Sequence, residues 1–106
     1  MVCPYFGGHG VGQNLHENPL ILHDLSNTND ATMEAGNTFT IEPILMLRAP
    51  SQYAQWEDKW TFVAPGVPSA QWEHIIAVTP GGCKVLTKRQ GEVWDEEIPQ
   101  ATSVDF

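Results

Sequence analysis

The sequence predicts an α+β fold that is mostly antiparallel sheet with little helix. Several short segments alternate β-branched or aromatic residues with polar ones, which is the pattern of half-buried strands. Nine glycines and eight prolines punctuate the chain, and only residues 50–60 have the spacing of an amphipathic helix. With 106 residues, 42% of them hydrophobic, the chain is long enough for one packed core and too short for two.

The first third of the chain is expected to consist of loops and short extended pieces. Glycine and proline are frequent in residues 1–20, which excludes a long helix there, and "NPLILHDL" (18–25) is expected to form a brief extended segment. Residues 26–37 are polar and are expected to form turns, with Gly36 and Asn37 suited to a positive φ angle.

The middle of the chain carries one predicted strand and the one predicted helix. Residues 38–45, "TFTIEPIL", are rich in β-branched and aromatic residues and predict a strand. Residues 50–60, "PSQYAQWEDKW", predict a short helix that Ser51 would cap. The aromatic residues at positions i, i+3 and i+7 of this helix are Tyr53, Trp56 and Trp60.

The last third of the chain predicts a hairpin followed by a tail. A short strand is expected over residues 61–67 and a longer one over 69–79. Two glycines then turn the chain into a strand over residues 83–87, which completes the hairpin. Residues 1–88 are therefore expected to form the folded domain, and the charged, aperiodic segment 89–106 a loose tail.

Charge and composition exclude several classes of function. Five Lys and Arg against thirteen Asp and Glu give a net charge of −8, which opposes nucleic-acid binding and favours metal cations or basic peptides. Cys3 and Cys83 are too few and too far apart for a disulfide scaffold or a structural zinc site. No apolar run is long enough to cross a bilayer, and the first ten residues lack the features of a secretory signal. A cytoplasmic location without membrane contact is expected, with an organellar one left open.

Two glutamates interrupt apolar strand patterns. Alternation of side chains puts Glu73 on the face of its strand opposite to Trp72, and it puts Glu42 beside apolar neighbours on another strand. A buried carboxylate needs a cation, a hydrogen-bond network or a proton. His9, in the glycine-rich "GGHGVG", is a third candidate, and an imidazole with two carboxylates suits Mn, Fe, Co or Zn.

The residues leave a simpler interpretation open, in which each glutamate lies at a sheet edge and faces water. The recurrence of His9, His16 and His23 every seven residues would align them on a helix, but Gly10, Gly12 and Pro19 exclude that helix. On this basis the spacing of the histidines is interpreted as accidental.

Four segments of the chain share an order and spacing with one known family. They are "GGHGVGQNLHENP" (7–19), "GNTFTIEP" (36–43), "DKWTFV" (58–63) and "SAQWEHIIAVTPGGCKVLT" (69–87). Together they resemble type I methionine aminopeptidases, over roughly three quarters of the chain. The resemblance implies a metallo-exopeptidase of the pita-bread fold, in which two halves clamp a pair of divalent ions (Co, Mn, Fe or Zn), and which removes the initiator methionine from nascent polypeptides.

The resemblance also implies roles for individual residues. His9 and Glu42 would each bind a metal ion, and Glu73 would bridge both ions. His16 would be the catalytic histidine that contacts the scissile peptide and donates a hydrogen bond to its oxygen. The methionine side-chain pocket would include Trp60, and Leu15 where the family usually has phenylalanine. The paired ions, roughly 3.5 to 4 Å apart, would lower the pKa of a water and polarise the carbonyl.

The chain departs from the family because only the C-terminal half is expected, with most helices and two aspartate ligands missing. Asp95 and Asp105 have a similar spacing but lie in the tail, so they are not expected to replace those ligands. The isolated chain is therefore expected to bind metal weakly and to be inactive unless it joins the missing N-terminal half. The alternatives are a non-catalytic binding module and a relative of the prolidases or aminopeptidase P.

Overall fold

The structure is a computed structural model that describes residues 1–97. Its strands are β1 (Gly7–Gly10), β2 (Glu17–Leu22), β3 (Thr38–Ile41), β4 (Ile44–Met46), β5 (Ala54–Gln55), β6 (Phe62–Val63), β7 (Ser69–Gln71), β8 (His74–Thr79) and β9 (Gly82–Val85). Residues 1–97 contain no helix, so the sheet-rich character of the prediction is confirmed and its helical part is not. The predictions for residues 98–106, including Asp105, lie outside the described residues.

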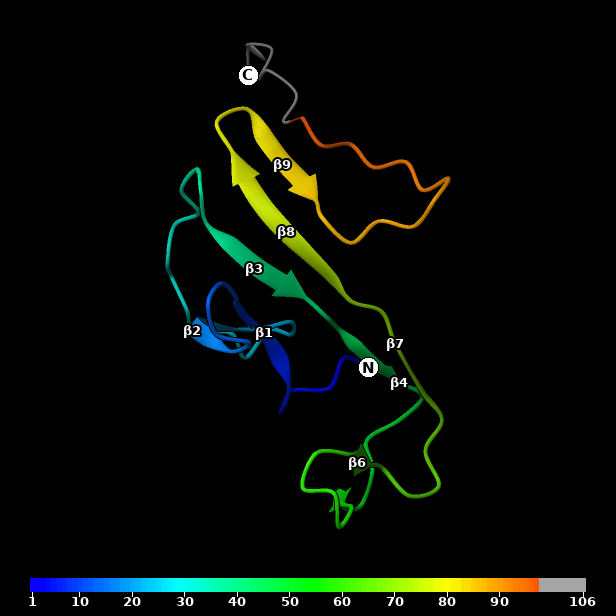
Figure 1. The fold of residues 1–106 in the computed structure, drawn as a ribbon. Helices are drawn as coiled ribbons and strands as arrows, with labels where there is room; N and C mark the ends of the chain where they lie inside the picture. The colour runs from blue at the N-terminus through cyan, green and yellow to red at the C-terminus, as the bar shows by residue number, and fades with distance from the viewer. Residues whose placement is uncertain (98–106) are drawn as a thin grey trace, which may run out of the picture.

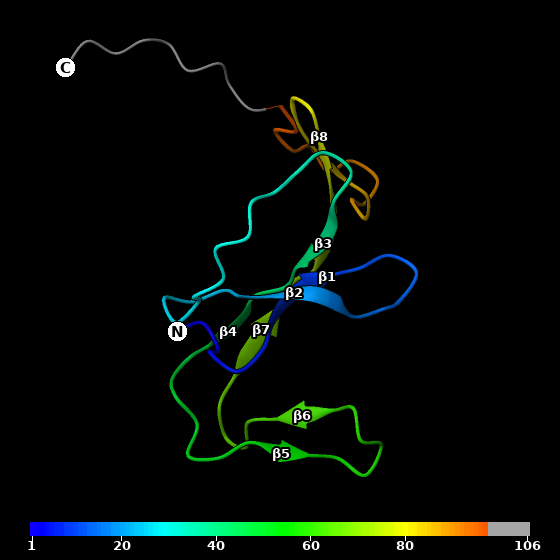
Figure 2. The same ribbon diagram turned by 90° about the vertical axis from the view of Figure 1, so that its left-hand side faces the viewer.

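The main layer is an antiparallel sheet of five strands in the order β2-β1-β3-β8-β9 (Figure 1). Beyond the ends of β3 and β8, the same two chain segments continue as the two-stranded ribbon β4–β7. Figure 2 shows the β5–β6 hairpin beyond this ribbon, at the end of the molecule away from β9. The predicted hairpin near residue 81 is confirmed as β8–β9, in which Thr79 pairs with Gly82.

The helix predicted for residues 50–60 is wrong, because this segment forms β5 and the turn that leads to β6. Trp56 and Trp60 are 58% and 67% exposed, so the aromatic spacing does not give this segment a buried face. A short helix in water depends on such packing for its stability. Asp58 instead fixes a tight turn, since its carboxylate accepts hydrogen bonds from the backbone N–H groups of Trp60 (2.9 Å) and Thr61 (2.8 Å). Lys59 within this turn has a φ angle of 60°.

The strands predicted for residues 38–45 and 69–79 are each interrupted once. The first breaks at Glu42 and Pro43 and the second at Trp72 and Glu73. Proline has no N–H for the ladder, which accounts for a break at that point. Both breaks lie at the same level of the sheet, because β3–β8 and β4–β7 are the two sides of one gap (Figure 1).

The buried apolar residues among those described are few: Met46 in β4, Ile76 in β8, Val85 in β9, and Cys3 in the N-terminal segment, whose N–H donates to the Ile44 carbonyl oxygen (2.9 Å). The polar segment 26–37 contains turns as predicted, and Gly36 has a positive φ angle of 94°. Asn37 does not share that conformation; its side-chain oxygen accepts a hydrogen bond from the N–H of Glu34 (2.9 Å).

Residues 88–97 run back along β9 (Figure 1). Glu96 accepts a hydrogen bond from the N–H of Val85 (2.8 Å) and pairs with Lys88 (2.5 Å). The domain boundary at residue 88 stays a prediction. In the part of the chain that the structure describes, no helix is long and apolar enough to cross a membrane.

Candidate metal centre

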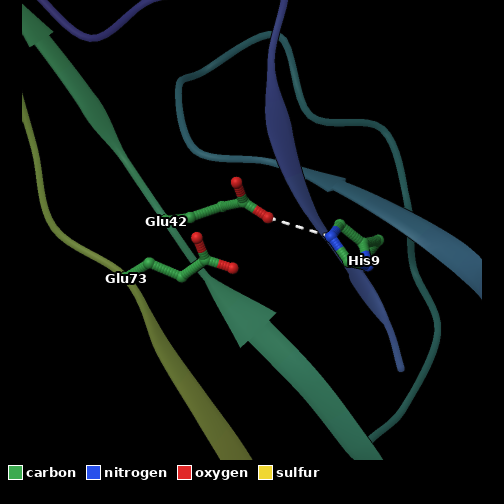
Figure 3. A group of neighbouring side chains, drawn as sticks. All are labelled: His9, Glu42 and Glu73. Carbon is green, nitrogen blue, oxygen red and sulfur yellow. Dashed lines mark ion pairs between the residues drawn. The ribbon is translucent and has the colours of Figure 1, made fainter. Parts of the chain in front are cut away.

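Three side chains from distant parts of the sequence meet at the gap in the sheet. His9, Glu42 and Glu73 each offer one ligand atom, and these atoms lie within 4.8 Å of one another. Figure 3 shows both carboxylates pointing toward the imidazole ring from neighbouring segments of the chain. His9 comes from β1, and the glutamates come from the two segments that lie between paired strands.

His9 is fixed at both its backbone and its ring. Its N–H donates to the Thr40 hydroxyl (3.0 Å), which ties β1 to β3. Its Nδ1 lies 2.9 Å from the Gly10 carbonyl, and since a carbonyl oxygen only accepts, Nδ1 carries the hydrogen. The other nitrogen, Nε2, lies 3.0 Å from Oε1 of Glu42 and would offer its lone pair to a metal ion bound between them. Gly8 makes the close approach possible, because a Cβ there would collide with the Thr40 carbonyl oxygen.

Glu42 is held by contacts that replace the missing ladder bonds. Its N–H donates to Nε2 of His23 (2.9 Å), and its Oε1 accepts a hydrogen bond from the Thr40 hydroxyl (2.8 Å). The Gln71 amide donates to the Glu42 carbonyl oxygen (3.3 Å). His23 and Gln71 fix the backbone at position 42 and the Thr40 hydroxyl fixes the carboxylate, as hydrogen-bonding partners of metal ligands do.

Glu73 faces Glu42 across the gap. The register on each side of the gap is given by the pairs Ile41–His74 and Ile44–Gln71. Because the register is the same on both sides, positions 42 and 73 lie opposite each other, and two like charges at opposite positions destabilise a sheet. Burial and the negative charge of Glu42 raise the pKa of Glu73, while His9 and His16 oppose this shift.

Neither carboxylate forms an ion pair with a lysine or arginine within residues 1–97. The nearest basic group is the His9 imidazole, whose Nε2 lies 3.0 Å from Oε1 of Glu42. One imidazole nitrogen and two carboxylates form a donor set that divalent ions such as Zn, Mn, Fe and Co accept. A divalent cation would relieve the repulsion between the carboxylates and use the lone pair of His9, so these residues fit a metal ion.

The three side chains open into a cleft of about 1090 Å³. His16 lies beside them, with its ring centroid 4.5 Å from that of His9 and 5.9 Å from that of Trp60. Aromatic residues from the N-terminal segment and the β5–β6 region line the rest of the wall: Tyr5, Phe6, Tyr53, Trp60 and Phe62. Leu15 is 64% exposed and the structure does not place it among the lining residues, so its part in a substrate pocket stays a prediction.

Sequence reasoning missed His23 and Thr40, which hold the ligands without being ligands themselves. The seven-residue spacing of the histidines was interpreted as accidental, yet all three lie around one site. They reach it through the β1–β2 hairpin, which folds residues 16 and 23 back toward residue 9. A hairpin, and not only a helix, can bring residues at this spacing together. The glycine-rich turn between residues 10 and 17 was the feature of the sequence that could have indicated it.

Comparison with known proteins identifies the class of protein that this fold and site define. The model of metallopeptidase family M24 matches residues 1–80, and the chain belongs to that family. Membership of a metallopeptidase family implies the use of a metal ion, in agreement with the donor set described above.

Relatives within the family are methionine aminopeptidases. The chain is 49% identical over 88 residues to the mitochondrial methionine aminopeptidase 1D of Danio rerio, covering 82% of this chain and 25% of that protein. It is 38% identical over 99 residues to the methionine aminopeptidase of Escherichia coli (strain K12), covering 92% of this chain and 36% of the relative. The predicted family resemblance is confirmed as a partial match, since the chain spans about a quarter of the length of the Danio rerio relative.

A solved structure shares the fold. The methionine aminopeptidase of Thermotoga maritima superimposes with a TM-score of 0.70 at 35% sequence identity, covering 83% of this chain and 35% of that one. Most of the described sheet therefore has a counterpart in a larger enzyme.

Proposed function

We propose that this chain forms the C-terminal half of a pita-bread catalytic domain that removes the N-terminal methionine from polypeptides. The observation that carries the proposal is the convergence of His9, Glu42 and Glu73 at the mouth of an aromatic cleft. A metal centre beside a pocket with apolar walls suits hydrolysis next to an apolar first residue. The names of the relatives in Danio rerio and Escherichia coli supply the substrate, the N-terminal methionine.

The proposed centre would hold two divalent ions, with His9 and Glu42 as ligands and Glu73 as the carboxylate shared by both ions. Bound there, the ions would supply Lewis acidity, lower the pKa of a water and polarise the peptide carbonyl. Glu73 suits the shared position, because its carboxylate has no hydrogen-bonded partner such as Thr40 provides for Glu42 among the described residues. Co, Mn, Fe and Zn all accept this donor set.

His16 is proposed to act on the substrate itself. Its ring lies 4.5 Å from that of His9 and lines the cleft, so an N–H of His16 can donate to the oxygen of a peptide held at the centre. Trp60, with its ring 5.9 Å from that of His16, is proposed to bound the pocket for the methionine side chain. An aromatic ring makes a favourable contact with a thioether sulfur.

The proposed centre is incomplete without a second segment of protein. Three side chains leave coordination positions open, and the relatives extend well beyond the matched region. We infer that the partner of this chain is the N-terminal half of the catalytic domain, which would supply further ligands. The assembled enzyme would act on nascent polypeptides in the cytoplasm or in an organelle; relatives include mitochondrial and chloroplastic forms.

A peptidase assay on two forms of the protein tests this proposal. Methionine release from a Met-Ala-Ser peptide is measured with added Mn²⁺ or Co²⁺, first for residues 1–106 alone. The second form joins residues 1–106 to the part of the Escherichia coli relative that precedes the match. Release by the joined form, its loss in Glu73→Gln and no release by the isolated chain are the expected results.

The same assay separates the alternatives. If the joined form folds but releases no methionine, the chain is a non-catalytic module of the family. Release of an N-terminal residue only from a peptide with proline in second position would instead indicate a prolidase-like or aminopeptidase P-like relative. Release by the isolated chain, abolished by Glu73→Gln, would show that no second half is required.

A further inference from the structure

Glu73 lies where the sheet does not hold the backbone. Strand β7 ends at Gln71 and β8 begins at His74, so Trp72 and Glu73 lie between the two ladders. A metal-binding carboxylate must be directed to within a few tenths of an ångström. Within residues 1–97, the backbone of Trp72 and Glu73 is therefore fixed by the side-chain contacts of Trp72 and His74 and not by ladder hydrogen bonds.

Both neighbours of Glu73 point to the other face of the sheet. Glu73 lines the metal cleft, whereas Trp72 and His74 line an apolar groove of about 730 Å³ on the opposite side. This is the alternation expected of an extended chain. Because the three side chains share two peptide units, anchoring Trp72 and His74 on one face fixes the direction in which Glu73 leaves the other.

His74 is buried, at 7% exposure, and both ring nitrogens are used. The indole N–H of Trp72 can only donate, so Nε2 of His74, 3.0 Å away, accepts. The hydrogen of the ring is then on Nδ1, which donates to the Thr87 hydroxyl oxygen at 2.7 Å. The same hydroxyl oxygen accepts the N–H of Ile75 at 3.0 Å. Thr87 therefore ties the first two residues of β8 to the segment that follows β9.

Trp72 is held from the same segment. The guanidinium carbon of Arg89 lies 4.0 Å from the centroid of the Trp72 ring, within the range of a cation–π contact. Glu92 lies behind this pair: its Oε2 accepts the indole N–H of Trp94 at 2.9 Å and lies 3.2 Å from Nε2 of His74. Its Oε1 lies 3.9 Å from Nε of Arg89 and has no hydrogen-bond partner within residues 1–97. Residues 87–94 thus form a clamp over Trp72 and His74, which we call the tail clamp.

We propose that the tail clamp positions Glu73 for metal binding from the far side of the sheet, with Thr87 and Arg89 as its positioning residues. The proposal rests on the metal centre of the proposed function. The clamp lies after residue 80, where the match to the family model ends. It would give the segment around Glu73 the rigidity that ladder hydrogen bonds give elsewhere in the sheet.

Metal affinity tests the proposal directly on residues 1–106. Mn²⁺ is titrated into each protein well below its melting temperature, and free Mn²⁺ is followed by electron paramagnetic resonance. Thr87→Val removes the hydroxyl at nearly constant volume and is expected to weaken Mn²⁺ binding about 10- to 100-fold, the usual effect of losing a group that orients a ligand. Thr87→Ser keeps the hydroxyl and is expected to bind within about threefold of the unchanged protein, because the oxygen that serves His74 is restored.

Two further variants separate positioning from general stability. Arg89→Gln removes the contact over Trp72 without touching the core and is expected to weaken Mn²⁺ binding about threefold. Glu96→Gln is the matched control, since it weakens the contacts of Glu96 with Val85 in β9 and with Lys88 but touches none of those to Trp72 or His74. Its Mn²⁺ affinity is expected to stay unchanged even where its melting temperature falls.

The outcomes are distinct. Unchanged affinity in Thr87→Val and Arg89→Gln overturns the tail clamp and leaves the metal centre standing. If Thr87→Val does not fold, Arg89→Gln against Glu96→Gln decides, and equal affinities overturn the proposal. If residues 1–106 alone bind no Mn²⁺, the same variants are compared in the form joined to the preceding part of the Escherichia coli relative, and an unchanged joined protein that binds no Mn²⁺ overturns the metal centre and the clamp with it.

Discussion

The two faces of the sheet carry similar residues but balance their charges differently. On the cleft face, Glu42 and Glu73 oppose each other, and no lysine or arginine within residues 1–97 pairs with them; their one basic neighbour is the His9 imidazole, 3.0 Å from Glu42. Toward the groove face, Glu92 also has a histidine neighbour, with its Oε2 3.2 Å from Nε2 of His74, and in addition its Oε1 lies 3.9 Å from Nε of Arg89. The carboxylates of the tail segment have cationic neighbours in the chain itself, as the pair Lys88–Glu96 also shows.

This difference separates a binding site from a structural cluster. Where a lysine or arginine of the chain pairs with a carboxylate, that carboxylate contributes to the fold and has less need of a metal ion. Where it supplies none, the repulsion between carboxylates is a cost that a cation from solution can remove. The cleft face, whose carboxylates lack a lysine or arginine partner, is therefore expected to bind metal ions. The groove face, whose carboxylate has such a partner, is not.

The largest expected effect is stabilisation by metal on the cleft face. Mn²⁺ at about 100 times its dissociation constant stabilises the folded chain by about 2.7 kcal/mol, which raises the melting temperature by roughly 10–20 °C for a domain of this size. The measurement is thermal unfolding followed by circular dichroism, with and without Mn²⁺ and then with excess EDTA.

Two variants test whether the rise in melting temperature with Mn²⁺ comes from the cleft face. The double variant Glu42→Gln, Glu73→Gln is expected to lose the shift entirely, whereas Glu92→Gln is expected to keep most of it. A shift of equal size in all three proteins would mean that Mn²⁺ binds acidic groups at large, and the contrast between the faces would disappear.

The next effect concerns backbone strain, which is confined to the cleft wall. Lys59, in the turn before Trp60, is the one non-glycine residue within residues 1–97 with a positive φ angle. A left-handed conformation costs a residue with a Cβ about 1–2 kcal/mol, and glycine avoids this cost. Glycine in turn loses more conformational entropy on folding, which costs about 0.5–1 kcal/mol. Lys59→Gly is therefore expected to stabilise the protein by roughly 0.5–1 kcal/mol in urea unfolding.

A lysine in a strand provides the comparison for that variant. Lys84 lies in β9, where glycine only adds freedom to the unfolded chain, so Lys84→Gly is expected to destabilise the protein by about 0.5–1 kcal/mol. Opposite signs for the two variants would confirm that the strain belongs to the cleft wall. If both variants change the free energy of unfolding in the same direction, the backbone at Lys59 is not strained.

A smaller effect compares one carboxylate on each face in the presence of EDTA at pH 7. Glu73→Gln removes one of two opposed charges and is expected to stabilise the metal-free protein by on the order of 0.5 kcal/mol. Glu92→Gln removes the charge that accepts from Trp94 and faces Arg89, so it is expected to lower the melting temperature. Two shifts of the same sign would contradict the charge balance assigned to the faces.

The sequence predicted the sheet and the meeting of the three candidate ligands better than it predicted the contacts that hold these side chains. Alternation placed Glu73 opposite to Trp72, and this orientation is seen because it depends only on the period of an extended chain. It could not show that both long strands break at the level of Glu42, since a break depends on how Pro43 meets its partner strand. The helical spacing of residues 50–60 failed for a related reason: it needs a surface to pack on, and Trp56 has none.

The smallest predicted effect is a pH dependence on the balanced side. Lys88, together with the N–H of Val85, holds the pKa of Glu96 below its ordinary value. A depressed pKa in the folded state means that Glu96 stabilises the protein above the unfolded pKa and that this contribution is lost as the pH falls through the folded value. The melting temperature of Glu96→Gln should therefore lie below that of the unchanged protein at pH 7, and the difference should close in the acid range below the ordinary glutamate pKa.

Glu97→Gln makes the same change of charge one residue along and serves as the control. A gap that stays constant from pH 7 to the acid range would assign Glu96 a role independent of charge, and the tail segment would then no longer illustrate a carboxylate balanced by its own chain.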